Sequence, residues 1–311
     1  MEVSVIMSVY NTDEKFLRDS IESILNQEFE DFEFIIINDG SQEETVKIIE
    51  SYTDDRIVRI NNIQNIGLTQ SLNVGLRVAK GKYIARMDAD DISYKLRLKK
   101  QYNFMEKHKN VDVLGVWTTD GKHVQKHDGN ISSESRKVRM LFKNAGIAHP
   151  TAFIRNAFLK QNGIQYDETI KKSQDYKLWI DCLACGGIFA VYPETLLLYR
   201  IHDKQISADV TGEQSRYAQE IRINLIRQLC SDITDAELQQ FIFLDKAMLS
   251  QEQFKVLCEK IEKGNNEKKI YNAKYLQYEL GEYRKRLYKS KDIGCVGYYL
   301  YYIKRMIKKQ I

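Results

Sequence analysis

Three aspartates within four residues follow an apolar run in the first third of the chain. Residues 82–87 form the run, and Asp88, Ala89, Asp90 and Asp91 come directly after it. Because an unpaired carboxylate is costly to bury, a strand that ends in three acids indicates that they face a cation, the hydroxyls of a ligand, or both. Residues two apart in an extended chain point the same way, so Asp88 and Asp90 are expected to share a side, with room beside the small Ala89. The alternative is a solvated turn that begins the next helix.

The elements before the acids alternate between strands and helices. Apolar, β-branched runs predict strands, and apolar side chains at helical spacing predict the helices between them. The predicted strands are 3–9, 32–37, 57–60 and 82–87, and the predicted helices cover about 16–25, 42–52 and 68–79. Ser41 and Glu44 have the spacing of a capping box at the start of the second helix. This alternation predicts βαβ units and a mostly parallel sheet.

Polar residues gather where these strands end. Tyr10 and Asn11 follow the first strand, Asp39 follows the second, and the three acids follow the fourth. In parallel sheets ligands bind beyond the carboxyl ends of the strands, so these residues are candidates for one binding site. No Gly-x-Gly-x-x-Gly follows the first strand and no Gly-Lys-Ser/Thr is present. Their absence argues against a dinucleotide-binding oxidoreductase and a P-loop NTPase.

Beyond the acids the pattern is mixed at first and then entirely helical. Residues 94–109, 133–143 and 173–185 are expected to be helical, 111–116, 148–153, 188–191 and 195–199 extended, and 119–130 a polar hairpin or loop. From about residue 210 the strand patterns stop, and 213–230, 234–243, 250–262 and 267–289 have helical periodicity. We therefore expect an α/β domain followed by a helical region.

The composition is that of a globular protein without membrane spans. The chain has 311 residues, of which 43% are hydrophobic and 29% charged. No apolar run reaches the roughly 18 residues that a spanning helix needs, and the N-terminus lacks the pattern of a signal peptide. The five cysteines are odd in number and scattered along a chain without a secretion signal, so they are expected to be reduced thiols. Cys182 and Cys185 have no second pair at zinc spacing, which favours structural burial over a zinc site. A cytoplasmic location is the expectation.

The basic charge of the chain is concentrated at its C-terminus. Residues 282–311 hold nine Lys and Arg against Glu282 and Asp292, a net charge of +7, whereas the whole chain carries +4. The same segment is rich in tyrosine. Aromatic and basic residues together are typical of segments that lie at a membrane interface, and each Lys or Arg near an anionic surface contributes about 1 kcal/mol. No nucleic-acid recognition module accompanies the basic tail, so nucleic acid is not an expected partner.

The pieces, taken in order, resemble the family 2 glycosyltransferases. Together they cover roughly residues 3–207, and their order and spacing carry the resemblance. The matching pieces are Val5-Ile6-Met7-Ser8-Val9-Tyr10-Asn11, Ile37-Asn38-Asp39-Gly40-Ser41, Asn65-Ile66-Gly67 with Asn73, Gly81-Lys82-Tyr83-Ile84-Ala85, Asp88-Ala89-Asp90-Asp91, Gln174-Asp175-Tyr176-Lys177-Leu178-Trp179, and Tyr199-Arg200-Ile201-His202 with Ser207.

The resemblance implies a GT-A fold. This fold is α/β, with a Rossmann-like, mostly parallel sheet that carries helices on both faces. A nucleotide-sugar half would span about residues 1–92 and an acceptor half about 93–207. The helical region 208–311, with its basic, Tyr-rich tail, would follow this 1–207 domain.

The resemblance also implies a role for individual residues. Tyr10 and Asn11 would line the base pocket of a UDP-sugar, Asp39 would hydrogen-bond the uracil or ribose, and Asp88 would contact the ribose. The implied donor-binding residues are Ser8, Tyr10, Asn11, Asp39, Asn65, Asp88, Ala89, Asp90, Arg200 and Lys204. Asp90 and His202 would hold a divalent metal, Asp175 would be the catalytic base, and His149 and Asp91 would lie on the acceptor side.

General chemistry supports these roles. A nucleotide-diphosphate leaving group is stabilised by Mg²⁺ or Mn²⁺ held by one or two carboxylates, and a His ligand favours Mn²⁺. A positioned general base on the acceptor hydroxyl contributes roughly 10²–10⁴-fold. One base without a protein nucleophile gives inversion. The acceptor would be a glycan or a polyprenyl-diphosphate-linked oligosaccharide of bacterial surface-polysaccharide synthesis, which suits a peripheral position on the inner face of the cell membrane through 282–311.

One departure from the family keeps alternatives open. The family commonly has Glu-Asp where this chain has Gln174-Asp175, so the presumed base remains but its neighbouring carboxylate is an amide. A catalytically silent nucleotide-sugar-binding partner is one alternative. A nucleotidyltransferase is another, although the Gly-rich, Lys/Arg-bearing loop typical of that class is absent after the first strand.

Overall fold

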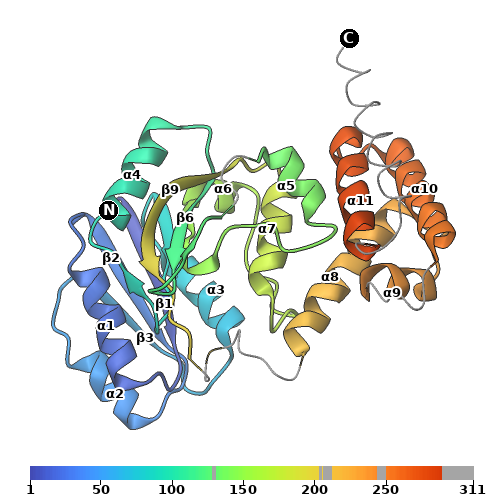
Figure 1. Ribbon diagram of the computed structural model, residues 1–311. Helices are drawn as coiled ribbons and strands as arrows, with labels where there is room; N and C mark the ends of the chain where they lie inside the picture. Colours follow the sequence, from blue (N-terminus) through green and yellow to red (C-terminus); the bar gives the residue numbers. More distant parts are fainter. Residues whose placement is uncertain (128–130, 203–204, 206–211, 244–249, 289–311) are drawn as a thin grey trace. The chain divides into compact units, whose positions relative to one another are not determined.

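The computed structural model describes residues 1–127, 131–202, 205, 212–243 and 250–288 (Figure 1). Lys204, Ser207, Cys295 and most of the basic tail therefore lie outside the described residues. By packing, the chain divides into two units. Met1–Ser133 and Gly146–Gln214 form the first, and Glu134–Ala145 joins the helices from Ser215 onward in the second.

Four parallel strands form the N-terminal part of the sheet in the first unit. Their order is β3 (Ile57–Asn61), β2 (Phe32–Asn38), β1 (Val3–Val9) and β4 (Tyr83–Arg86). These bounds agree with the predicted strands to within one residue. Near-continuous burial of β1 and β2 is typical of parallel strands that are covered on both faces.

The remaining strands make the sheet mixed. Antiparallel pairing joins β8 (Phe153–Arg155) to β4 and to β6 (Val113–Thr119), and β9 (Phe189–Leu198) runs parallel to β6. Two short strands, β5 (Ile92–Ser93) and β7 (Val124–Gln125), pair antiparallel with β9 and β6. The α/β fold class is confirmed: the long pairings among β1, β2, β3 and β4 and between β6 and β9 are parallel, and each antiparallel pairing involves only two or three residues of a strand. Of these antiparallel pairs, β6 and β7 are joined by a short turn, a connection that needs no crossover helix.

Helices cover both faces of this sheet (Figure 1). On one face α1 (Glu14–Leu25), α2 (Glu43–Glu50) and α4 (Arg97–Lys107) share a core with the strands. On the other face lie α3 (Leu68–Val78) and, with it, two helices of the second half of the unit. The first core consists of Val3, Val5, Met7, Val9, Leu17, Ile21, Ile24, Phe32, Phe34, Ile36, Ile48, Ile49, Ile57, Tyr83, Ala85, Met87, Ala89, Leu98, Met105, Val111, Leu114, Phe153 and Leu197.

The helices of the second face pack around a small apolar cavity. α6 (Asn156–Gln161) contributes Leu159 and α7 (Gln174–Ala184) contributes Leu178 to its wall. A short 3₁₀ turn, η1 (His149–Thr151), leads into β8, so only Phe153 of the stretch 148–153 that was expected to be extended lies in a strand. The six-residue helix α6 was not predicted.

The second unit is helical, as expected. It contains most of α5 (Ser133–Arg139) with α8 (Glu213–Leu229), α9 (Asp235–Phe243), α10 (Gln251–Lys268) and α11 (Ala273–Leu287). The segment 134–145, expected in the acceptor half, packs here instead, because the Phe142 ring contacts the rings of Phe241 and Tyr283. The packing boundary also falls after Gln214 rather than at residue 207.

Two further observations bear on the sequence expectations. The capping box at Ser41 is wrong: α2 has Gln42 as its N-cap without a side-chain hydrogen bond, and the Ser41 hydroxyl donates to the carbonyl of Val9 and accepts the N–H of Asn11. Among the described residues, no helix is both long enough and apolar enough to cross a membrane.

Candidate active site

The acids and their partners lie where β1, β2 and β4 end. The chain leaves β4 at Arg86 and turns through Asp88, Ala89 and Asp90 before β5. Ala89 is buried, whereas the side chains of Asp88 and Asp90 are 28% and 27% exposed. The turn thus leaves two carboxylates partly exposed on either side of a small buried residue.

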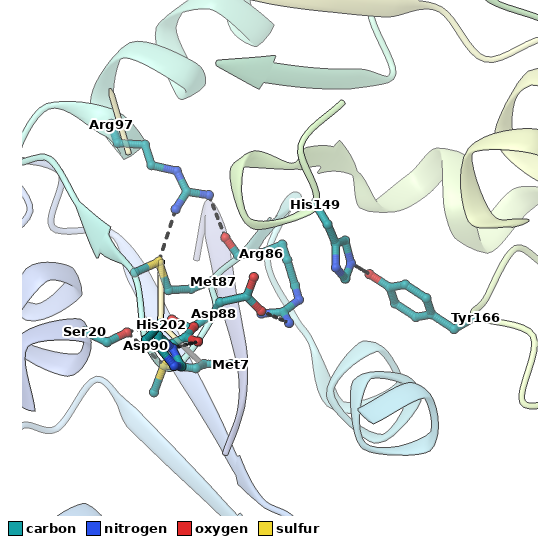
Figure 2. Close-up of polar contacts among 10 residues, drawn as sticks. All are labelled: Met7, Ser20, Arg86, Met87, Asp88, Asp90, Arg97, His149, Tyr166 and His202. Atoms are coloured by element: carbon teal, nitrogen blue, oxygen red, sulfur yellow. Dashed lines mark hydrogen bonds and ion pairs between the residues drawn. The ribbon is translucent and has the colours of Figure 1, made fainter. Parts of the chain in front are cut away.

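Each of the two exposed acids has a defined partner (Figure 2). Asp88 Oδ1 accepts a hydrogen bond from Arg86 Nη2 at 2.5 Å, and Asp90 Oδ2 lies 2.9 Å from His202 Nε2. Burial raises the pKa of Asp88, the charge of Arg86 opposes this shift, and the charge of Asp90 adds to it. The two carboxylates are therefore close enough to interact, and an additional cation between them and a diphosphate would be favourable.

Asp91 lies beneath the other two acids. Its side chain is buried, Oδ1 accepts the backbone N–H of Arg200 at 3.0 Å, and Oδ2 has no partner among the described residues. Burial raises its pKa to about 8, and the charges of Asp88 and Asp90 contribute in the same direction. The observed contact ties Asp91 to the loop after β9, and its acceptor contact stays a prediction.

Two buried arginines that the sequence analysis did not select adjoin the acids. Arg86 and Arg97 are 3% and 0% exposed. Arg97 donates from Nη2 to the carbonyl of Arg86 at 2.6 Å and from Nη1 to Met87 Sδ at 3.4 Å (Figure 2). Burial lowers the pKa of Arg97 to about 9, so it remains a cation at neutral pH. In the sequence, Arg86 could have been noticed as an arginine inside an otherwise apolar strand, and Arg97 has no comparable signal.

The segment after β9 is attached to α1. Arg200 Nη2 donates to Asp19 Oδ2 at 2.7 Å, and the guanidinium lies 4.8 Å from the centroid of the Phe16 ring. The His202 ring is 5.0 Å from the same ring. These contacts bring Arg200 and His202 to the acids from more than 100 residues away in sequence. Lys204, predicted beside them, lies outside the described residues.

The residues predicted to bind the base surround the ends of β1 and β2. Tyr10 is 53% exposed. Asn11 adopts φ 48°, and its side-chain oxygen accepts the N–H of Gln42 at 2.8 Å. Ser8 is half-buried and Asn65 is exposed. Their exposure is compatible with contact to a ligand, and their donor-binding roles stay predictions.

Asp39, which was predicted to contact the uracil or ribose, makes hydrogen bonds within the fold. Its side chain is buried and accepts three hydrogen bonds at 2.9 Å, from the backbone N–H groups of Ile66 and Gly67 and from the amide of Asn62. The carboxylate therefore holds the loop that begins α3. A carboxylate has about four acceptor positions, which leaves capacity for one ligand contact.

A second group of polar residues lies around η1 and the start of α7. His149 Nε2 is 2.7 Å from the hydroxyl of Tyr166 (Figure 2), and Trp179 packs edge-on against the imidazole. Burial lowers the pKa of His149 well below its ordinary value, and the charge of Arg86 adds to this effect. Burial also raises the pKa of Tyr166, with a contribution from Asp175. Asp175, half-buried in the first turn of α7, is thus near the His149–Tyr166 pair.

The donor set of Asp90 and His202 fits a divalent metal bound together with a substrate. Within the ranges that the structure describes, no three His, Cys, Asp or Glu side chains gather as a self-contained metal site. A cation that bridges a diphosphate needs only one or two protein ligands, because phosphate oxygens and water complete its shell. One carboxylate oxygen and one imidazole nitrogen 2.9 Å apart meet that requirement, and the nitrogen favours Mn²⁺ over Mg²⁺.

Comparison with known proteins places this chain in a family. The model of the glycosyl transferase family 2 matches residues 4–162. An uncharacterised glycosyltransferase of Methanocaldococcus jannaschii is 38% identical over 227 residues, which are 70% of this chain and 76% of the relative. The O-antigen biosynthesis glycosyltransferase WbnJ of Escherichia coli is 38% identical over 65% of this chain and 80% of the relative.

Solved structures share the fold. S. aureus TarS, in a complex with UDP-GlcNAc, superposes with a TM-score of 0.62 at 21% identity, over 89% of this chain and 84% of that one. A mannosyltransferase from Pyrobaculum calidifontis, in a complex with GDP-Man and Mn²⁺, gives a TM-score of 0.53 at 12% identity, over 98% and 80%. The resemblance drawn from the sequence is confirmed, including its GT-A fold. The chain belongs to glycosyl transferase family 2 and is a glycosyltransferase.

Proposed function

We propose that this glycosyltransferase transfers a sugar from a UDP-sugar with inversion and with the help of a divalent metal. The observation that carries the proposal is the meeting of Asp90 and His202, 112 residues apart in sequence, beside Asp88 at the ends of the parallel strands. A turn that served only to begin the next helix would not need a histidine from the far end of the domain.

The donor would lie along the edge formed by β1, β2 and β4. Tyr10 and Asn11 would bind the base, with Asp39 at the uracil or ribose, and Asp88 would accept hydrogen bonds from the ribose hydroxyls. Asp90 and His202 would hold Mn²⁺ or Mg²⁺. When bound, the metal neutralises charge that develops on the diphosphate leaving group. The UDP-GlcNAc of TarS and the Mn²⁺ of the mannosyltransferase support these two assignments by analogy of fold.

Asp175 would take the proton from the acceptor hydroxyl as that oxygen attacks the anomeric carbon. A carboxylate in the first turn of a helix is favoured by the helix dipole, and the charge of Asp175 contributes to the raised pKa of Tyr166, which supports a role on the same side as His149 and Tyr166. That pair would form part of the acceptor side. A single displacement by the acceptor oxygen inverts the anomeric configuration, because no protein group forms a covalent intermediate.

The acceptor would be a glycan or a lipid-linked oligosaccharide. The relative WbnJ acts in O-antigen biosynthesis according to its name, which supports surface-polysaccharide assembly as the setting. An acceptor built on a polyprenyl diphosphate lies in the membrane. We therefore also propose that the basic, Tyr-rich residues of 282–311 attach the protein to the cytoplasmic face of an anionic membrane.

A screen of nucleotide sugars tests the donor and the metal. The protein is incubated with UDP- and GDP-sugars in the presence of Mn²⁺ or Mg²⁺, with and without candidate acceptors, and release of the nucleotide is measured. We expect release from a UDP-sugar that stops when a chelator is added. Activity that is insensitive to chelator would remove Asp90 and His202 from metal binding, and release from GDP-sugars alone would contradict the choice of uridine.

Replacement of Asp175 tests the base. In Asp175→Asn we expect the binding of UDP to persist while transfer falls by about 10²–10⁴-fold, the contribution of a positioned general base. Asp181→Asn, on the same helix and paired with Lys177, is the matched control and should keep its transfer rate. Unchanged transfer in Asp175→Asn would exclude this residue as the base.

A further inference from the structure

Arg86 occupies a position on β4 that the packing around it does not require to be charged. Its neighbours Ala85 and Met87 point into the core shared with α1 and α2. Arg86 and Ile84 point to the opposite face and line the apolar cavity there. The other residues of its wall are Ile6, Leu72, Leu76, Ile154, Leu159, Tyr166 and Leu178. An aliphatic side chain of the same length would suit this wall better than a guanidinium.

The hydrogen bonds of Arg86 satisfy only part of this buried charge. The side chain is 3% exposed, and Nη2 donates to Asp88 Oδ1 at 2.5 Å. Nε and Nη1 are buried and have no partner among the described residues. Buried donors of a cation that lack hydrogen-bond partners lower the stability of the fold. A residue that lowers stability in this way and still makes one short hydrogen bond is a candidate for a functional role through that bond. Here that contact is Asp88.

Arg86 lies between the proposed donor side of the site, at Asp88, and the proposed acceptor side, at His149 and Tyr166. Figure 2 shows its side chain between Asp88 and the pair formed by His149 and Tyr166. The buried nitrogens cannot reach a ligand without rearrangement, so Arg86 acts through a neighbour. Its contact at 2.5 Å is with the acid that is 28% exposed at the site. The partly exposed carboxylate can touch a substrate, and the buried guanidinium fixes its direction.

We propose that Arg86 is a positioning residue for the donor: it orients the Asp88 carboxylate for the hydroxyls of the nucleotide and makes no contact with the nucleotide itself. The inference rests on the proposed use of a UDP-sugar. A charge-assisted hydrogen bond to a planar guanidinium fixes a carboxylate more strictly than water does. Nε and Nη1 remain without hydrogen bonds to the described residues when the guanidinium is held in this orientation, and the fold is less stable for that reason.

Affinity should fall much more than stability in Arg86→Met. Methionine keeps the length of the stem and matches the apolar wall, which offsets the loss of the contact with Asp88, and the carboxylate left without that partner is 28% exposed rather than fully buried. We expect a melting temperature close to that of the wild type, together with affinity for UDP in the presence of Mn²⁺ that is lower by about tenfold or more in calorimetry. A lower melting temperature with wild-type affinity would show a purely structural role and overturn the inference.

A double-mutant cycle tests whether Arg86 acts through Asp88. The affinity for UDP with Mn²⁺ is measured for Arg86→Met, Asp88→Asn and the double variant. If the arginine works through the aspartate, its replacement has little further effect once Asp88 is changed, so the losses are strongly non-additive. Losses that simply add would overturn the proposal. Arg86→Lys, which keeps the charge without the planar geometry, should bind UDP with an affinity between those of the wild type and Arg86→Met.

A second interior arginine provides the control. Arg155 on β8 also has a buried Nε without a hydrogen bond to the described residues, and it contacts the Tyr83 hydroxyl and, at 3.9 Å, Asp112 Oδ1 rather than the acids at 88–91, so Arg155→Met should keep the wild-type affinity for UDP. If Arg86→Met does not fold, Arg86→Lys decides: lowered affinity at an unchanged melting temperature supports the inference, and wild-type affinity overturns it.

If the wild-type protein binds no UDP with either metal, the proposed donor is wrong and the inference about Arg86 is wrong as well. If the wild type binds UDP and Arg86→Met binds it equally, only the inference fails.

Discussion

The turn after β4 concentrates charge in a small volume. Asp91 is 1% exposed and Arg97 is fully buried, and the partly exposed Asp88 and Asp90 lie above them. Like charges that meet in a low-dielectric interior repel strongly. Arg86 and Arg97 offset part of this repulsion, and a cation at Asp90 would offset more. Under the proposed function, a donor and its metal would complete the charge balance of the site.

His149 gives a pH dependence that can be measured without substrate. Its pKa is depressed in the folded protein, so the unfolded chain binds the proton more readily. The contribution of His149 to the free energy of unfolding is therefore fully present above its pKa in the unfolded chain, about 6.5, and decreases as the pH falls below that value. Between pH 7.5 and pH 5 the loss due to this residue is at most about 2 kcal/mol, at 1.36 kcal/mol per pH unit.

The contribution of His149 can be isolated by replacing it. His149→Gln does not titrate and keeps a side chain that can hydrogen-bond the Tyr166 hydroxyl. The free energy of unfolding in urea, measured at pH 7.5 and pH 5, should fall less in this variant than in the wild type. His123→Gln, at a side chain that is 80% exposed, should show the wild-type decrease. Equal decreases in the wild type and His149→Gln would contradict the depressed pKa.

Residue types and spacing selected the part of the candidate site that is local in sequence. The acids at 88–91 and the residues after the first two strands could be selected because each stands directly after a strand. His202 entered only through the family resemblance. Arg86, Arg97, Phe16 and Asp19 were missed because their importance comes from contacts with residues distant in sequence. The three hydrogen bonds that Asp39 accepts could not be predicted either, since they depend on where the 62–67 loop lies.

At the scale of elements, the segment after β9 depends on α1 for its position. We expect Asp19→Asn to weaken this attachment by about 1 kcal/mol, the upper range for a partly exposed ion pair. Amide hydrogen exchange in residues 199–202 should then be about fivefold faster, since 1.4 kcal/mol corresponds to tenfold. Glu14→Gln, which breaks the exposed pair with Arg18 on the same helix, should leave these amides unchanged. Faster exchange in both variants would indicate a general loosening of α1 instead.

The turn after β2 requires glycine for two reasons. Gly40 has φ +69°, and a Cβ there would lie 2.4 Å from the carbonyl carbon of Gln64 and 2.5 Å from the nitrogen of Asn65. Because backbone atoms cannot move aside cheaply, Gly40→Ala should destabilise the fold by about 2–4 kcal/mol. Gly67 has φ +90° with open space around it, so Gly67→Ala should cost only about 1–2 kcal/mol. Denaturant unfolding of both variants measures the difference, and equal losses would contradict the close approach at Gly40.

Long periodic elements could be predicted from the sequence, and short or tertiary ones could not. The four parallel strands and the C-terminal helices carry enough apolar repeats to be recognised. The strand β5 has two residues and the helix α6 has six, which are too few for a strand or helix periodicity to be recognised in the sequence. Antiparallel pairing of β8 with β4 and β6 is also invisible locally, because the direction of a strand is set by the path of the chain that precedes it.

At the scale of the whole molecule, the helical unit determines where the basic tail can be removed. Tyr283 on α11 is buried, and its hydroxyl donates to the carbonyl of Phe241 at 2.8 Å. Leu276 and Leu280 of the same helix are also buried. A cut within α11 would therefore damage the core of this unit. Tyr288 follows α11 as its C-cap, so a chain that ends there keeps the described helices.

Removal of residues 289–311 tests the proposed membrane attachment. This segment holds six Lys and Arg against one Asp, a net charge of +5, and each basic residue near an anionic surface contributes about 1 kcal/mol. In vesicle sedimentation we expect the full chain to bind vesicles that contain phosphatidylserine, with binding weakened by salt, and the chain ending at Tyr288 to bind them more than tenfold less. A full-length variant with the six basic residues changed to Gln separates charge from length and should bind as weakly as the shortened chain. Equal binding of the full and shortened chains, at equal melting temperatures, would show that residues 289–311 do not attach the protein to the membrane.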